Sequence, residues 1–280
     1  MEIGIGMFPN AASISPAAVA RLAEDRGFES LWVAEHSHIP VGTVAADGSD
    51  LARRYYKTLD PFVALTAAAT ATTRLKIATG VALVPQRDPI ITAKEVASLD
   101  VVSGGRFLFG VGAGWNRQEM RDHGTDPRTR MRLVTERMQA MIELWTVDQA
   151  EFHGKYVDFG PTYAEPKPAQ FPHPPVHVGG DGPTVADRVV AFGDGWVPNH
   201  AAGREDEVIR RFEDMRQRAG RPLELSISGA PGERLALTRL RDLGVHRAFV
   251  WLPQDDDTNG VVTPSEAERF LDRLAANRPS

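Results

Sequence analysis

Eight short apolar runs recur along the chain, and the segments between them show helical spacing of apolar residues. Val19, Leu22 and Ala23, for example, fall at positions i, i+3 and i+4. Strands that are apolar along their length and alternate with helices are typical of a parallel sheet covered on both faces. Eight of them predict a single (β/α)8 TIM barrel over residues 1–280, and an open doubly wound sheet is the alternative. The runs are 2–8, 30–36, 75–83, 106–114, 175–180, 194–199, 223–228 and 246–252.

Local capping signals mark where the predicted helices begin and end. An N-cap oxygen directly before proline indicates a helix start, because the missing N–H of proline would be unsatisfied there anyway. Glu266 follows Thr263 by three residues, which is the spacing of a capping box. Glycine after a helical pattern indicates a left-handed C-cap. The starts are Ser15-Pro16, Asp60-Pro61, Asp88-Pro89 and Thr263-Pro264, and the ends are Gly27, Gly104-Gly105, Gly220 and Gly244.

Two intervals are longer than a loop and a helix require, at about 37–59 and 116–173. The second contains a long predicted helix, 128–146, then two short strand-like arms around Gly154, and then a passage from 161 to 175 that is too rich in proline for regular structure. Long loops inside a compact domain usually form lids or binding loops. We interpret both intervals as insertions on the C-terminal face of the barrel, where substrates bind.

Composition excludes several classes of function. The 280 residues carry a net charge of −5 and contain no cysteine, so neither nucleic acid nor an anionic membrane is an expected partner, and disulfides and thiolate metal sites are excluded. The N-terminal residues lack a basic region, and no apolar run approaches a membrane span. We therefore expect a soluble, cytoplasmic protein. No metal site is predicted, since the run Asp255–Asp257 lacks metal-loop spacing and is interpreted as a solvated loop.

Polar and glycine-rich residues gather where predicted strands end. Glu35 and His36 follow strand two, and from position alone they are as well explained by hydrogen-bonded structure as by a site. Gly80 indicates a bulge or close backbone approach in strand three. Gly179 and Gly180, just before Pro183 at a predicted helix start, favour an anion site.

Strand four ends in GVGAGWN (110–116), which is not a dinucleotide fingerprint, because tryptophan occupies the place of the third glycine. Its glycines still allow a flat ligand to lie against the backbone. The strand ends together suit a flat, phosphate-bearing cofactor better than a hydrolytic centre. The residues alone do not name that cofactor.

The order of these motifs resembles the luciferase-like superfamily of flavin- and deazaflavin-dependent oxidoreductases, and within it the branch that uses coenzyme F420. The matching stretches are IGIGMF, SLWVAEHSH, TGVALVPQRDP, GGRFLFGVGAGWNRQE, VHVGGDGP and GDGW. The resemblance implies a barrel of the bacterial luciferase type. It also implies that His36 is catalytic and faces the reactive edge of the cofactor ring, and that Gly80-Val81 is a non-prolyl cis peptide behind the ring. The cofactor-binding residues that it implies are Glu35, Thr79, Gly80, Val81, Gly112, Gly114, Trp115, Gly179 and Gly180.

The sequence departs from the superfamily at one informative position. The F420-dependent sugar-phosphate dehydrogenases have a proton-donating glutamate where this chain has Trp115, which argues against oxidation of a sugar phosphate. Glu119 is a weak candidate for proton transfer, and we interpret it as a solvated helix residue.

The predicted function is hydride transfer between F420 and a small organic substrate. The alternatives are a two-component monooxygenase that depends on FMN, and a non-catalytic flavin-binding protein. A homodimer, for instance through helix 128–146, is a further expectation.

Overall fold

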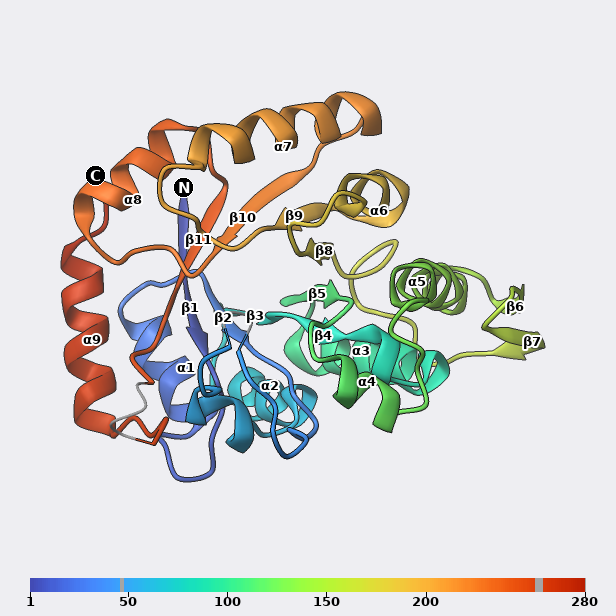
Figure 1. The fold of residues 1–280 in the computed structure, drawn as a ribbon, viewed down its shortest axis with the longest axis horizontal. Coiled ribbons are helices and arrows are strands. Elements are labelled where there is room, and N and C mark those ends of the chain that lie inside the picture. The colour runs from blue at the N-terminus through green and yellow to red at the C-terminus, as the bar shows by residue number, and fades with distance from the viewer. Residues whose placement is uncertain (46–47, 255–258, 280) are drawn as a thin grey trace.

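The computed structural model describes residues 1–45, 48–254 and 259–279, and these form a closed barrel of parallel strands surrounded by helices (Figure 1). The sheet runs β3-β2-β1-β11-β10-β9-β8-β5-β4, and pairing of β3 with β5 closes it. The barrel prediction is therefore confirmed. The run Asp255–Asp257 lies outside the described residues. The barrel strands are β1 (Glu2–Met7), β2 (Ser30–Val33), β3 (Lys76–Thr79) with β4 (Ala82–Leu83), β5 (Phe107–Gly112), β8 (Val176–Gly179), β9 (Gly195–Val197), β10 (Glu224–Ser228) and β11 (Arg247–Trp251).

The four helices with an N-cap residue before proline begin where the sequence predicts. Ser15, Asp88 and Thr263 each cap a helix whose first residue is proline, and Asp60 does so with one carboxylate oxygen that accepts two backbone N–H groups. The capping box of Glu266 is present. The helices are α1 (Pro16–Asp25), α2 (Pro61–Thr70), α3 (Pro89–Ser103), α4 (Arg117–Asp122), α5 (Arg130–Thr146), α6 (Val185–Phe192), α7 (Glu205–Ala219), α8 (Arg234–Asp242) and α9 (Pro264–Ala276), with 3-10 turns η1 (Arg53–Lys57) and η2 (Val84–Gln86).

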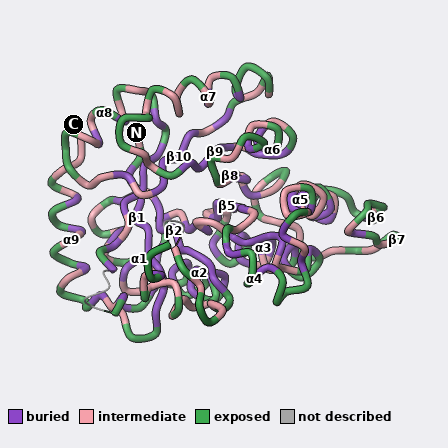
Figure 2. Tube along the Cα trace, in the orientation of Figure 1, coloured by how far each residue is buried: buried purple, intermediate pink, exposed green. Residues whose placement is uncertain are grey.

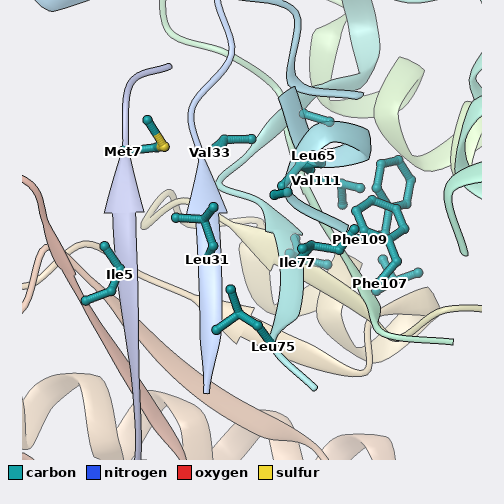
Figure 3. Packing of buried hydrophobic residues seen from close by; sticks show 14 of the residues in the cluster. Ile5, Met7, Leu31, Val33, Leu65, Leu75, Ile77, Phe107, Phe109 and Val111 are labelled. Atoms are coloured by element: carbon teal, nitrogen blue, oxygen red, sulfur yellow. The ribbon is translucent and has the colours of Figure 1, made fainter. Parts of the chain in front are cut away.

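The barrel strands are mostly buried (Figure 2). Alternation along each strand divides the core into two layers. Leu31 and Val33 point outward with residues of neighbouring strands and pack beneath the helices (Figure 3). Trp32 points inward and stacks on Phe249, with ring centroids 4.6 Å apart and planes at 3°. The barrel interior is thus filled by aromatic side chains. A ligand at the barrel axis must therefore bind above this plug, at the ends of the strands.

Only part of the second insertion lies at the C-terminal ends of the strands. Helix α4 does, but strands β6 (Gln149–His153) and β7 (Asp158–Tyr163) form an antiparallel hairpin that projects beside α5 (Figure 1). Glu136 of α5 accepts backbone N–H groups from this hairpin. Gln170 bonds Asp100 and the carbonyl of Phe107, which begins β5. The stretch after α5 therefore lies on the outside of the barrel and at its N-terminal end, contrary to our interpretation.

Three further predictions about local structure need correction. Strand three is interrupted after Thr79 and resumes at Ala82. Helix α6 begins at Val185 with Thr184 as its N-cap, later than Pro183. Strand β7 includes residues 161–163, which were expected to be irregular. Among the described residues, no helix is long and apolar enough to cross a membrane.

Candidate active site

A cleft of about 490 Å³ opens at the C-terminal ends of the strands, above the aromatic plug. Its volume falls within the range of about 300–1,000 Å³ that small-molecule sites occupy. Five of the predicted site residues line it: Glu35, His36, Gly80, Val81 and Trp115. The other residues that line it were not expected from the sequence, and they are Phe8, Ala34, Arg54, Tyr55, Leu83, Asn199, Ser228, Trp251, Leu252, Pro253 and Gln254.

His36 is held at the edge of this cleft by a carboxylate. Its Nδ1 lies 2.8 Å from Oε2 of Glu119, and the two side chains are 5% and 0% exposed. Because a carboxylate accepts, this bond places a proton on Nδ1 and leaves Nε2 of the neutral ring as an acceptor. Nε2 has no hydrogen-bond partner among the described residues. His36 can therefore take up a proton in the cleft, and the Glu119 carboxylate would stabilise the resulting imidazolium.

Glu119 is not the solvated residue that we expected. It lies in the first turn of α4, whose N-cap Asn116 accepts the backbone N–H of both Gln118 and Glu119. This turn points Glu119 back to strand two, where its Oε1 also accepts the backbone N–H of Ser37 at 3.0 Å. The Asn116-x-x-Glu119 spacing was visible in the sequence as a capping signal. Its direction toward His36 was not, because that depends on how residues 113–116 turn.

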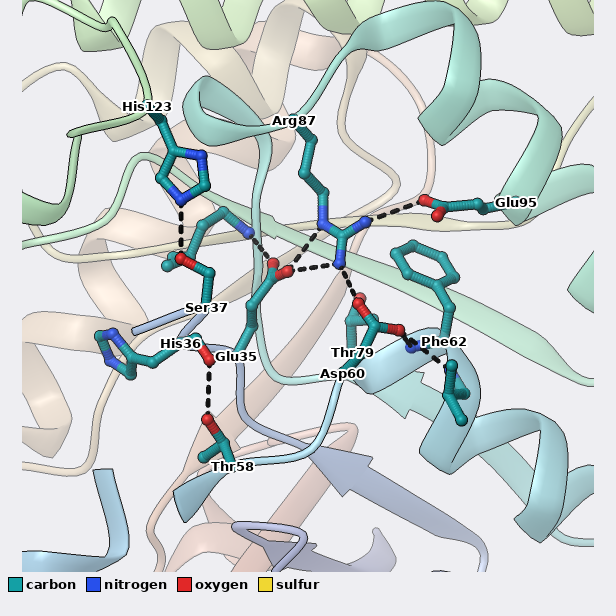
Figure 4. A network of polar contacts seen from close by, with 12 residues as sticks. Glu35, His36, Ser37, Thr58, Asp60, Phe62, Thr79, Arg87, Glu95 and His123 are labelled. Carbon is teal, nitrogen blue, oxygen red and sulfur yellow. Dashed lines mark hydrogen bonds and ion pairs between the residues drawn. The ribbon is translucent and has the colours of Figure 1, made fainter. Parts of the chain in front are cut away.

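Glu35 does not pair with His36, although the two are adjacent. Its side chain turns the other way, toward Arg87, whose Nε donates to it at 2.7 Å (Figure 4). Arg87 also binds Asp60 and Glu95. Burial by itself would lower the pKa of Arg87, but the facing carboxylates, Glu35 foremost, hold it above its usual value. The other oxygen of Glu35 accepts the backbone N–H of Leu83, so Glu35 joins strand two to the chain beyond Gly80.

Gly80 and Val81 form one wall of the cleft, and the peptide bond between them is cis, as the resemblance implies. The Val81 side chain fills the space beside two glycines of neighbouring strands. A Cβ at Gly112 would lie 2.5 Å from one methyl of Val81, and a Cβ at Gly179 would lie 3.0 Å from the other. These two glycines therefore support the wall from behind, and neither lines the cleft.

The remaining predicted residues occupy varied positions. Thr79 is fully buried, and its hydroxyl donates to the Gly110 carbonyl. Gly114 has a φ of 74° and lies near Met120. Trp115 is 44% exposed, and its ring centroid is 5.6 Å from that of His36. Gly180 has a φ of 103° at the end of β8, with open space where a Cβ would be.

The rim of the cleft is built from segments far apart in the sequence. Gln254, just after β11, bonds both the backbone N–H and the carbonyl of Phe8. Arg54 of η1 donates to the carbonyl of Gln254 and lies over the rings of Phe8 and Tyr55. Gly260, with a φ of 70°, approaches so closely that a Cβ would lie 2.8 Å from Cα of Arg54. The first insertion is thus fixed against the chain that follows the last strand.

A second cavity, of about 640 Å³, lies around the loop between α4 and α5 and is lined by Arg117, Arg121, Arg128 and Arg130. Arg128 is paired with Asp126. Arg117 forms no ion pair with any residue in the described ranges. A smaller hollow shares Trp115 with the cleft and shares Arg117 and Arg121 with this cavity. A basic surface therefore continues outward from the cleft. No cluster of three or more metal-ligating side chains occurs among the residues that the structure describes.

Known proteins resemble the chain over nearly its whole length. An uncharacterised protein of Mycobacterium tuberculosis is 39% identical over 99% of this chain and 98% of its own. Two solved structures share the fold over 99% of this chain and 98% of theirs. They are the monooxygenase RslO1 from Streptomyces bottropensis, with a TM-score of 0.79 and 20% identity, and the F420-dependent tetrahydromethanopterin reductase from Methanopyrus kandleri, with 0.73 and 19%. The family model for luciferase-like monooxygenases matches residues 15–232. The chain belongs to this family, whose members are oxidoreductases or monooxygenases.

Proposed function

We propose that this protein is an oxidoreductase that moves a hydride between coenzyme F420 and a small organic substrate. The observation that carries the proposal is the pair formed by His36 and Glu119 at the edge of a cleft whose wall is Gly80 and Val81. Removing a hydride from an alcohol, or adding one to a carbonyl, leaves one proton to be taken up or supplied. His36 is positioned to exchange that proton, with Glu119 balancing its charge.

The residues present fit a deazaflavin. The cis Gly80-Val81 wall, supported by Gly112 and Gly179, offers a backbone surface for a flat ring, and Trp115 offers an aromatic side chain. The open backbone at Gly180, between β8 and α6, would hold the cofactor phosphate. When bound, F420 supplies the hydride chemistry. The protein's part is to position the ring, exclude water and place the proton.

The arginine-lined cavity supports F420 over FMN. F420 carries a negatively charged glutamate tail beyond its phosphate, whereas FMN ends at the phosphate. The basic surface lined by Arg117 and Arg121 suits such a tail. Replacing both arginines with alanine should weaken binding of F420 and leave the tail-free deazaflavin riboside unaffected. Arg273→Ala, an exposed charge on α9, is the matched control.

The test is a titration of purified protein with F420 and with FMN, each oxidised and reduced, followed by tryptophan fluorescence. Binding of F420 with negligible binding of FMN supports the proposal, and Trp115→Phe should reduce the quenching. Preference for FMN would overturn it in favour of a monooxygenase supplied by a separate reductase. If the protein binds F420 and His36→Ala leaves every tested turnover unchanged, a non-catalytic binding protein is favoured. Binding of neither cofactor would refute both cofactor assignments.

We further propose that the protein self-associates through α2 and α3. Large apolar side chains on these helices are strongly exposed, whereas the apolar residues of α5 that we expected to serve are buried in the monomer. Helices α2 and α3 pack side by side, so these side chains lie on adjoining elements. The exposed residues are Val63, Ile90, Ile91, Val101 and Val102.

A further inference from the structure

Behind His36, on the side away from the cleft, a row of hydrogen-bonding side chains leads from the fully buried Glu119 to the surface. Ser37 Oγ lies 3.4 Å from Glu119 Oε1 and 2.6 Å from His123 Nε2. His123 is exposed. Figure 4 shows the Ser37 hydroxyl turned toward His123. Every group in this row can both gain and lose a proton.

The row has a second branch at Ser37. Its Oγ also lies 2.8 Å from Nδ1 of His38, and His38 Nε2 lies 3.1 Å from Oδ2 of Asp122. The side chains of His38 and Asp122 are 42% and 40% exposed, so this branch also reaches solvent. The centroids of the His38 and His123 rings are 5.4 Å apart, and both rings contact the Ser37 hydroxyl.

The proposed function creates a need for such a connection. A ring and substrate that fill the cleft would cover His36 Nε2, so His36 could not exchange a proton with bulk water on that side. Tyr55 and Trp115 pack against the His36 ring. The charged group that contacts His36 is Glu119 of α4, and the neighbouring Glu35 is engaged by Arg87. Glu119 is therefore the exit available to the proton.

We propose that Glu119, Ser37 and His123, with His38 and Asp122 as a branch, form a proton relay between His36 and solvent. This inference rests on the proposed function of the same site. After His36 Nε2 takes up a proton in the cleft, the proton on Nδ1 passes to Glu119 Oε2. The carboxyl turns and passes a proton to Ser37 Oγ, while the Ser37 hydroxyl proton moves to His123 Nε2.

His123 then releases a proton from its other nitrogen to water. Glu119 is again a carboxylate, Ser37 again a hydroxyl, and His36 is neutral with its proton on Nε2. In that state His36 can donate a proton in the reverse reaction, and the same steps run backwards when a proton enters. The proton count balances without any added oxidant or reductant.

The first test needs no cofactor, so its outcome does not depend on the proposed function. In protein labelled with nitrogen-15 at its histidines, the exchange of the His36 Nδ1 proton with water is measured by NMR. We expect Ser37→Ala to slow this exchange about tenfold or more. The backbone N–H of Ser37 still binds Glu119 in this variant, so the carboxylate keeps its place.

The two branches give a sharper comparison. His123→Gln and His38→Gln should each slow exchange only partly, and the double variant should match Ser37→Ala. His153→Gln, which removes a surface histidine bonded to Asp158 on the hairpin, is the control and should change nothing. Exchange within twofold of the parent protein in both Ser37→Ala and the double variant would overturn the relay.

A second test uses the protein bound to F420. While the cleft is covered, each proton that His36 takes up must leave through Glu119, so turnover should be lower in Ser37→Ala than in the parent protein. Once a substrate is known, the turnover of Ser37→Ala should be restored by a small diffusible buffer such as imidazole, while KM stays unchanged. Failure of F420 to bind would count against the proposed function only. Turnover of Ser37→Ala equal to that of the parent protein would count against the relay.

Discussion

Neighbouring residues can have unrelated tasks, and Glu35 and His36 illustrate this at the scale of single side chains. The sequence suggests an acid-histidine pair, but the carboxylate that serves His36 comes from Glu119, 83 positions later. Glu35 is instead enclosed with Arg87 and the backbone of Leu83. Its task is to hold the wall of the cleft in place, and it can be tested apart from the chemistry.

Glu35→Gln should destabilise the protein by about 3 kcal/mol, because it leaves the guanidinium of Arg87 without its most buried carboxylate. The free energy of unfolding is measured by denaturation with urea. Glu95→Gln is the matched control, since Glu95 binds the same guanidinium but is 32% exposed, and it should cost clearly less. Equal losses in the two variants would contradict the assigned role of Glu35.

At the scale of elements, the wall of the cleft is a packing problem shared by three strands. The chain at Gly80 turns the Val81 side chain toward β5 and β8. Glycine is needed at positions 112 and 179 of these strands, because the valine already fills the space that a Cβ would take. The sequence showed glycines at strand ends, but both a ligand and a packed side chain explain such glycines. Only the contact between distant segments decides between them.

Gly112→Ala should therefore destabilise the protein by about 1–3 kcal/mol and weaken cofactor binding, since the new methyl group collides with Val81. The double variant Gly112→Ala with Val81→Ala should recover much of both losses. Thermal unfolding and the fluorescence titration measure the two effects. A double variant no better than the sum of the single variants would show that the two sites do not interact.

Strand β8 carries a buried histidine into the barrel interior. Both ring nitrogens of His177 lack hydrogen-bond partners, and burial together with the nearby Arg247 lowers its pKa from 6.5 to about 4. Between these two values the unfolded chain binds a proton that the folded chain does not. Stability should therefore fall by about 3 kcal/mol as the pH drops from about 6.5 to about 4.

The measurement is the free energy of unfolding as a function of pH for the parent protein and His177→Gln. The variant should lose most of the slope in this window. Glu29, whose pKa falls to about 2 beside Arg247, contributes at lower pH, because its stabilising charge is lost as the pH drops from 4.5 toward 2. Identical slopes above pH 4.5 in the two proteins would contradict the expected behaviour of His177.

At the scale of the whole molecule, local signals predicted the framework and distant contacts decided the site. Proline after Ser15 or Asp60 defines a helix start within a few residues, and apolar runs define strands, so the barrel followed from the sequence. The direction of the Glu119 side chain and the place of the hairpin could not be predicted in this way. They depend on how a loop turns in three dimensions, and no short pattern encodes that.

We expect the protein to be a dimer in solution, held by the exposed apolar residues of α2 and α3. Val63→Lys with Val102→Lys places charges on that face and should shift the protein to monomer by size-exclusion chromatography with light scattering. Leu235→Lys, which changes a still more exposed leucine on α8, is the control. A monomeric parent protein, or a double variant that stays dimeric, would refute this interface.

The contact of Arg54 with Gln254 and Gly260 has a consequence for redesign of the enzyme. The loop after β2 contributes Arg54 and Tyr55 to the cleft and is therefore a natural segment to exchange between relatives. Arg54 in this loop, however, is hydrogen-bonded to Gln254, about 200 positions away. A grafted loop would bring its own contact surface but not the segment after β11 against which that surface packs. Libraries that vary residues 37–59 should therefore vary the segment after β11 at the same time, because each new rim needs a support of complementary shape.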